Sequence, residues 1–118
     1  MLKRLEKYQV TKRLLEEYQR DLAQCQEWLS LSPSHELEII QAYNQDHIKE
    51  LQEALESYKE QIRGVRVVDR QLGDLLALRC IGGLEWLEIA QYLGVSMSEL
   101  NRLKARVNEG VVSTIIND

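Results

Sequence analysis

Residues 86–105 read WLEIAQYLGVSMSELNRLKA, and the spacing of small and apolar side chains in this stretch decides the fold of the C-terminal part of the chain. Ala90 stands where two crossing helices would approach most closely, and a larger side chain there would push them apart. Gly94 follows four residues later, where a positive φ is cheap only without a Cβ. The pattern predicts a helix-turn-helix. Its small core is expected to contain Ile89, Leu93, Val95, Leu100 and Leu103.

The second helix of this unit is expected over residues 97–108, because Ser96 and Glu99 have the spacing of a capping box. In helix-turn-helix proteins that bind DNA, the early residues of the second helix face base edges in the major groove. Arg102 suits guanine and Asn101 suits adenine, since each side chain can make two hydrogen bonds to that base. The candidate DNA-binding residues are Ser96, Met97, Ser98, Asn101 and Arg102, with Lys104 and Arg106 as phosphate contacts.

Residues 75–107 also carry a set of positions that matches a known pattern: Leu78, Arg79, Gly83, Trp86, Ile89, Ala90, Leu93, Gly94, Ser96 and Arg102. On these residues the stretch resembles region four of bacterial sigma factors and the phage-borne ArpU-like transcriptional regulators. The resemblance implies a helical module that binds promoter DNA or RNA polymerase, preceded in the phage regulators by a further helical region. The chain departs from this family in its second helix, where Met97, Glu99 and Asn101 replace a more polar and basic set.

The N-terminal half of the chain carries two long helical patterns, with apolar residues at alternating steps of three and four. Residues 30–34 separate them, with Ser32 suited to cap a helix and Pro33 to its first position. Because a short turn joins them, the sequence predicts an antiparallel, coiled-coil-like hairpin over residues 1–64. The first seam is Tyr8, Thr11, Leu15, Tyr18, Leu22, Cys25 and Leu29, widened by Leu5, Leu14 and Trp28; the second is Leu37, Gln41, Asn44, Ile48, Leu51, Leu55, Tyr58, Ile62 and Val65.

A change of character near Gly64 marks the expected joint between this hairpin and a helix-turn-helix domain over residues 65–118. Residues 65–68 are rich in β-branched valine, which disfavours the middle of a helix. Residues 69–81 read as a further helix, which Gly82 and Gly83 would end. Residues 111–116 are apolar and β-branched, and the pattern fits either a cover for the core or a contact with a partner. The fold class is therefore all-α.

The composition bounds the function classes. The net charge of -4 is unusual for a free-standing nucleic-acid binder. Attraction to phosphate would therefore depend on the local positive charge of Arg102, Lys104 and Arg106 and not on the total charge. No catalytic constellation, phosphate loop or cofactor motif is recognisable, and the isolated cysteines and the His47–Glu50 spacing do not make a metal site. We expect a non-enzymatic, cytoplasmic protein without cofactor or metal, because no segment is apolar enough to be a signal or to cross a membrane.

Two functions from different classes fit these observations. The first is a DNA-binding transcriptional regulator, encoded by a phage or mobile element, with double-stranded DNA as its partner. One helix-turn-helix contacts a single half-site, and the long hairpin leaves apolar surface uncovered, so a homodimer is expected. The alternative is a protein-interaction module of the same fold that docks on RNA polymerase or another regulator and inhibits or redirects it. The acidic total and Glu99 favour that alternative.

Overall fold

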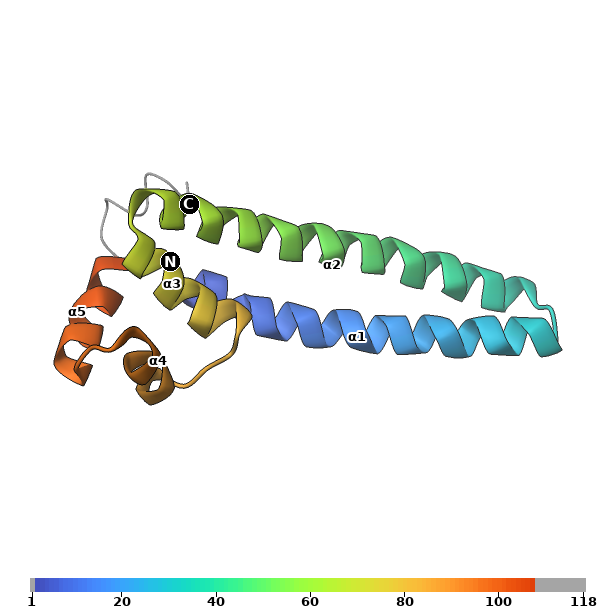
Figure 1. The fold of residues 1–118 in the computed structure, drawn as a ribbon. Coiled ribbons are helices and arrows are strands. Elements are labelled where there is room, and N and C mark those ends of the chain that lie inside the picture. Colours follow the sequence, from blue (N-terminus) through green and yellow to red (C-terminus); the bar gives the residue numbers. More distant parts are fainter. Residues whose placement is uncertain (1, 108–118) are drawn as a thin grey trace. The chain divides into compact units, whose positions relative to one another are not determined.

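The computed structural model describes residues 2–107, and within that range the chain is built from helices alone (Figure 1). The prediction of an all-α fold is confirmed. Asn108 and the apolar segment 111–116 lie outside the described residues. None of the helices in the described range is both long and apolar enough to cross a bilayer. The elements are α1 (Leu2–Leu31), α2 (His35–Val68), α3 (Arg70–Leu76), the π-helical segment η1 (Ala77–Ile81), α4 (Trp86–Leu93) and α5 (Met97–Val107).

The contacts within the chain form two compact units. One unit contains residues 2–9 and 57–107, and the other contains residues 10–56. The start of α1 and the end of α2 therefore belong with the C-terminal helices, whereas the rest of the hairpin, including its turn, is a unit of its own. The two domains expected from the sequence, residues 1–64 and 65–118, are defined by independent folding and not by contacts. That division stays a prediction.

Residues 10–56 form the antiparallel pair of helices that the heptad-like spacing predicted. Every residue of the two predicted seams is buried or half-buried. The turn differs from the expectation, because the amide of Ser32 still donates to the carbonyl of Trp28 and so closes α1. Ser34 rather than Ser32 begins α2, with its hydroxyl accepting from the amide of Leu37. Leu14 and Trp28 do not widen the seam; their exposed fractions are 40% and 52%.

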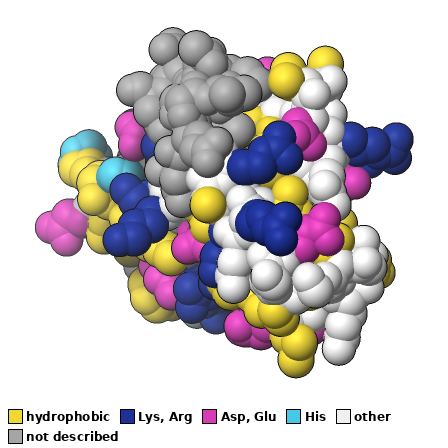
Figure 2. All heavy atoms as spheres, turned by 90° about the vertical axis from the view of Figure 1, so that its left-hand side faces the viewer, with side chains coloured by type: hydrophobic (Ala, Val, Ile, Leu, Met, Phe, Trp, Pro, Cys, Tyr) yellow, Lys and Arg dark blue, Asp and Glu magenta, His cyan; other side chains and the backbone are white. Residues whose placement is uncertain are grey.

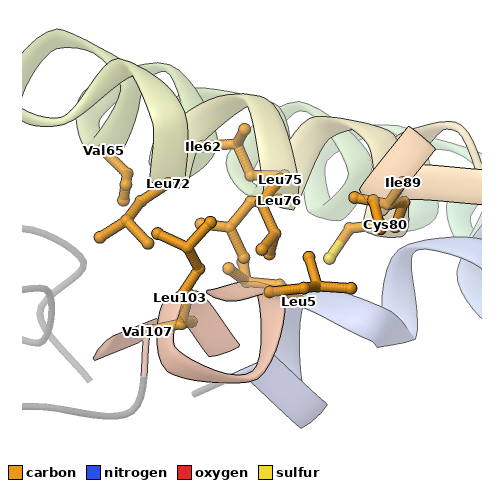
Figure 3. Packing of buried hydrophobic residues seen from close by; sticks show 12 residues of the cluster. Leu5, Ile62, Val65, Leu72, Leu75, Leu76, Cys80, Ile89, Leu103 and Val107 are labelled. Carbon is orange, nitrogen blue, oxygen red and sulfur yellow. The ribbon is translucent and has the colours of Figure 1, made fainter. Parts of the chain in front are cut away.

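The other unit is organised around one aliphatic cluster (Figure 3). Leu72, Leu75 and Leu76 of α3 lie at its centre and are almost completely buried. Each fully buried aliphatic side chain stabilises the fold by about 1.5 to 3 kcal/mol, so the cluster supplies the main driving force for this unit. Four further elements pack against these leucines: α1 with Leu5, α2 with Ile62 and Val65, α4 with Ile89 and Ala90, and α5 with Leu100, Leu103 and Val107.

The chain turns from α2 into α3 over a single residue, and this turn lies later than the sequence suggested. Helix α2 continues through Gly64 to Val68, because Val65 is buried in the cluster and its packing outweighs the low helix propensity of valine. Asp69 then caps α3 by accepting from the amide of Leu72 at 3.2 Å. At the closest approach of the two helices, a Cβ on Gly73 would lie 2.4 Å from the Cα of Arg66.

The predicted helix over residues 69–81 is present but changes its winding. After α3 the segment η1 has π-type bonds, such as the one from the amide of Gly82 to the carbonyl of Ala77 at 2.9 Å. Gly83 then takes the left-handed conformation that ends the segment, with φ 69°. The side-chain amide of Gln9 donates to the carbonyls of Cys80 and Ile81, which have lost helical partners at this end.

Gly73→Ala is expected to lower the free energy of unfolding by about 2 to 3 kcal/mol, because the added methyl group meets backbone atoms that cannot move aside. Gly94→Ala is the contrasting control: its Cβ would meet nothing within 4 Å, and only the positive φ opposes it. That strain costs about 1 to 2 kcal/mol. Urea denaturation followed by circular dichroism measures both changes, and a Gly73→Ala protein as stable as the wild type would contradict the close packing.

Candidate nucleic-acid interface

The turn between α4 and α5 has the geometry that the sequence predicted. Gly94 is left-handed, with φ 68° and ψ 34°, and the amide of Val95 donates back to the carbonyl of Ala90 at 3.0 Å. The hydroxyl of Ser96 accepts from the amide of Glu99 at 3.2 Å, which caps α5 as expected. Ala90 is buried where α4 meets the core. Helices α4 and α5 are therefore two separate helices with a defined bend between them.

Helix α5 divides into a buried face and an exposed face. Leu100, Leu103 and Val107 are at most 4% exposed and anchor the helix in the aliphatic cluster. Because these residues fix the rotation of α5, the positions between them face outward. Of the predicted DNA-binding residues, Lys104 is half-buried and the rest are exposed: Ser96, Met97, Ser98, Asn101, Arg102 and Arg106. The structure thus gathers all seven on one short helix and its cap.

Arg102 differs from Lys104 and Arg106, whose cationic groups contact Trp86 and Asp69. It is exposed and forms no ion pair with any residue in the range 2–107. Asn101 is exposed beside it. Both side chains are long enough to reach beyond the helix surface, and Ser98, one turn earlier, is small. The first two turns of α5 therefore expose one cation and one amide group to solvent.

Lys104 has a specific position inside the unit. Its Nζ lies 4.2 Å from the centre of the Trp86 ring, and the guanidinium carbon of Arg79 lies 4.6 Å from the same ring. Such cation–π contacts stabilise by about 0.5 to 1 kcal/mol at exposed sites. Arg79 in turn donates to the carboxylate of Glu6 and to the carbonyl of Leu84. Trp86, at the start of α4, thus contacts η1 through Arg79 and α5 through Lys104.

Arg106 is held by an ion pair that the sequence analysis did not foresee. Its Nη2 lies 2.7 Å from Oδ2 of Asp69, the same carboxylate that caps α3 through its other oxygen. The pair is partly exposed, at 49% for Arg106 and 27% for Asp69. An aspartate directly before a helix is a common N-cap, and that signal could have found the cap. The pairing itself joins residues 37 positions apart and has no local signal.

Acidic side chains surround the basic ones on this part of the surface. Glu85, Glu88 and Glu99 are all exposed; Glu85 directly precedes α4, Glu88 lies in α4 and Glu99 lies in α5. The carboxylate of Glu88 accepts from the amide of Glu85 at the start of α4. Figure 2, which looks onto the end that carries α4 and α5, shows Lys and Arg side chains interspersed with Asp and Glu. The interface therefore offers discrete cations rather than a broad positive field.

Cys80 lies buried in the aliphatic cluster. Burial raises the pKa of its thiol to about 12, with a further upward contribution from Glu6 that Arg79 partly opposes. The thiol is therefore neutral at physiological pH and a poor nucleophile. Cys25 and Cys80 are both free and buried. Within residues 2–107 no group of three or more histidine, cysteine or acidic side chains could hold a metal ion.

Comparison with known proteins found no matching family model, no matching curated protein and no matching solved structure.

Asp69 allows its two contacts to be separated by substitution. Asp69→Ala removes both the cap and the ion pair and is expected to lower the free energy of unfolding by about 1 to 2 kcal/mol. Asp69→Asn keeps an oxygen that can accept from Leu72 and loses only the charge, so we expect a loss of about 0.5 kcal/mol or less. Thermal or urea denaturation of the two variants provides the measurement. Equal losses would show that the cap contributes nothing.

Proposed function

We propose that this chain is a DNA-binding transcriptional regulator that places the first two turns of α5 in the major groove. The observation that carries this proposal is the exposed pair Asn101 and Arg102 on a helix whose opposite face is buried, directly after the left-handed turn at Gly94. A rigid helix with an outward polar face is the arrangement that helix-turn-helix proteins use to read base edges. The resemblance to sigma region four and to phage ArpU-like regulators supports the same reading, including a phage or mobile-element origin.

In this proposal, base recognition comes from the N-terminal half of α5. Arg102 donates two hydrogen bonds to a guanine and Asn101 makes two with an adenine. Ser96, Met97 and Ser98 face the groove beside them. Because Ser98 is small, the helix can approach the bases closely.

Phosphate contacts come from the C-terminal half of α5, where Lys104 and Arg106 already have partners within the protein. Arg106 would share its charge between Asp69 and a phosphate, and the exposed glutamates reduce the attraction further. Sequence-independent binding scales with the number of phosphates neutralised, and its salt dependence scales in the same way. We therefore expect weak non-specific binding with a shallow salt dependence, and specificity that depends on Arg102.

The direct test is selection of binding sites from a library of random DNA duplexes by the full chain at low salt. Arg102→Ala is expected to weaken binding to the selected site by about 5- to 150-fold, corresponding to 1 to 3 kcal/mol, and to relax the preference at one base pair. Arg20→Ala, which removes an exposed arginine from α1 in the other unit, is the matched control and should leave affinity unchanged. If no sequence is enriched, or if both variants behave alike, the proposal is wrong.

Asp69→Asn gives a prediction of the opposite sign. Removing the carboxylate charge releases Arg106 for a phosphate, so affinity for the selected site is expected to increase about threefold to tenfold at low salt. The slope of log affinity against log salt should steepen by about one, because one more phosphate is neutralised. Fluorescence anisotropy over a salt series measures both quantities. An unchanged slope would exclude Arg106 as a phosphate contact.

The second candidate function is a protein-interaction module that docks on RNA polymerase or another regulator. The observation in its favour is apolar surface on the motif itself: Leu87 is 60% exposed, Tyr92 77% and Met97 42%. In that case Tyr92→Ala would abolish partner binding and Arg102→Ala would not. Affinity purification from the native host with and without nuclease separates the two functions, because a protein partner retained after nuclease treatment favours docking on protein.

A further inference from the structure

The hairpin unit, residues 10–56, buries very little of its own side-chain surface. Of its residues, only Leu15, Cys25 and Asn44 are buried. A pair of helices has one contact layer, so each helix covers a single narrow stripe of the other. The same unit exposes a larger set of apolar residues than it buries: Val10, Leu14, Trp28, Leu31, Ile39, Ile40 and Tyr43, each between 40% and 78% exposed.

Five of these residues lie on one side of the hairpin, which we call the hairpin face: Val10, Leu14, Trp28, Ile40 and Tyr43. On α1, Val10 and Leu14 are one turn apart, and Trp28 follows Leu14 by two heptads, so the three share a flank. On α2, Ile40 and Tyr43 are three residues apart and share a flank in the same way. Ile39 points away from this side, because it lies opposite the seam of α2. Leu31, three residues after Trp28, continues the α1 flank to the end of that helix.

An aromatic cluster joins the two flanks across the hairpin. The ring of Tyr18, one turn after Leu14 on α1, stacks on His47 of α2 with 5.2 Å between ring centres. His47 also contacts Tyr43 at 4.3 Å. The flank that carries Leu14 and the flank that carries Tyr43 therefore meet on the same side of the unit, and the five apolar residues form one surface across both helices.

The size of this surface indicates what covers it. The five side chains expose roughly 400 Å² in total, judged from the area that such side chains bury. A standard protein interface takes about 800 Å² from each partner and is somewhat more than half apolar. The hairpin face is therefore close to the apolar area that one side of a stable dimer needs.

We propose that the hairpin face pairs with the hairpin face of a second copy of this chain, forming a four-helix bundle. A two-fold dimer uses the same patch on both copies, so a single self-complementary apolar face is sufficient. Pairing supplies the second layer of helices that residues 10–56 lack. The use of this dimer in reading two DNA half-sites rests on the proposed function, whereas the pairing itself does not.

The adjacent residues Ile39 and Ile40 provide a matched test. They are the same residue type and similarly exposed, at 57% and 48%, but only Ile40 lies on the hairpin face. Sedimentation equilibrium of the full chain over a concentration series is expected to show a dimer for the wild type and for Ile39→Glu. Ile40→Glu should raise the dimer dissociation constant by about 30-fold or more, as loss of a central interface residue does.

Circular dichroism of each variant reports whether the helices remain folded, and Trp28→Gln tests the same face from α1 with a milder change. A wild-type chain that stays monomeric over the whole series overturns the proposal. Equal weakening by Ile39→Glu and Ile40→Glu, or a dimer that survives both Ile40→Glu and Trp28→Gln, overturns it as well. Sedimentation and DNA binding of the wild-type chain together separate this inference from the proposed function: a dimer that binds no DNA contradicts only that function, and a monomer that binds DNA contradicts only the hairpin pairing.

Discussion

Burial of one aliphatic cluster determines the arrangement of residues 2–9 and 57–107. The leucines of α3 contact residues from both ends of this unit, from Leu5 of α1 to Val107 of α5. None of the short helices α3, α4 and α5 is long enough to be stable alone in water, so each depends on its apolar stripe being covered by the others. The exposed side of α5 is a consequence of this packing, because the rotation that buries Leu100 and Leu103 turns Asn101 and Arg102 outward.

The electrostatics of α5 follow from the same packing and change along the helix. Its second half is tied to the rest of the unit, with Arg106 paired to Asp69 and Lys104 over Trp86. Its first half carries Arg102 and Asn101 without such ties. A helix whose cations are engaged in its second half attracts phosphate less strongly than a uniformly basic helix would.

The hairpin unit is organised on a different physical basis. Its seam is narrow and contains a polar residue, Asn44, among its buried positions. Buried asparagine in a helical seam costs stability and can specify register. A thin seam of this kind, together with the exposed hairpin face, is consistent with a structure completed by further helices. The chain thus consists of a well-packed unit with a polar exposed face on α5 and a lightly packed unit with exposed apolar side chains.

The sequence by itself determined the elements and the motif, because these depend on local periodicity and backbone stereochemistry. The seams of the hairpin, the left-handed turn at Gly94 and the cap at Ser96 are all set by residues within a few positions of one another. Tertiary structure alone decided which cations are paired. The contacts between Arg106 and Asp69 and between Arg79 and Glu6 span 37 and 73 residues, so only the folded packing brings these side chains together. Packing also set the end of α2, because the burial of Val65 outweighs the low helix propensity of valine. Trp28 is exposed because no third element covers it within its unit.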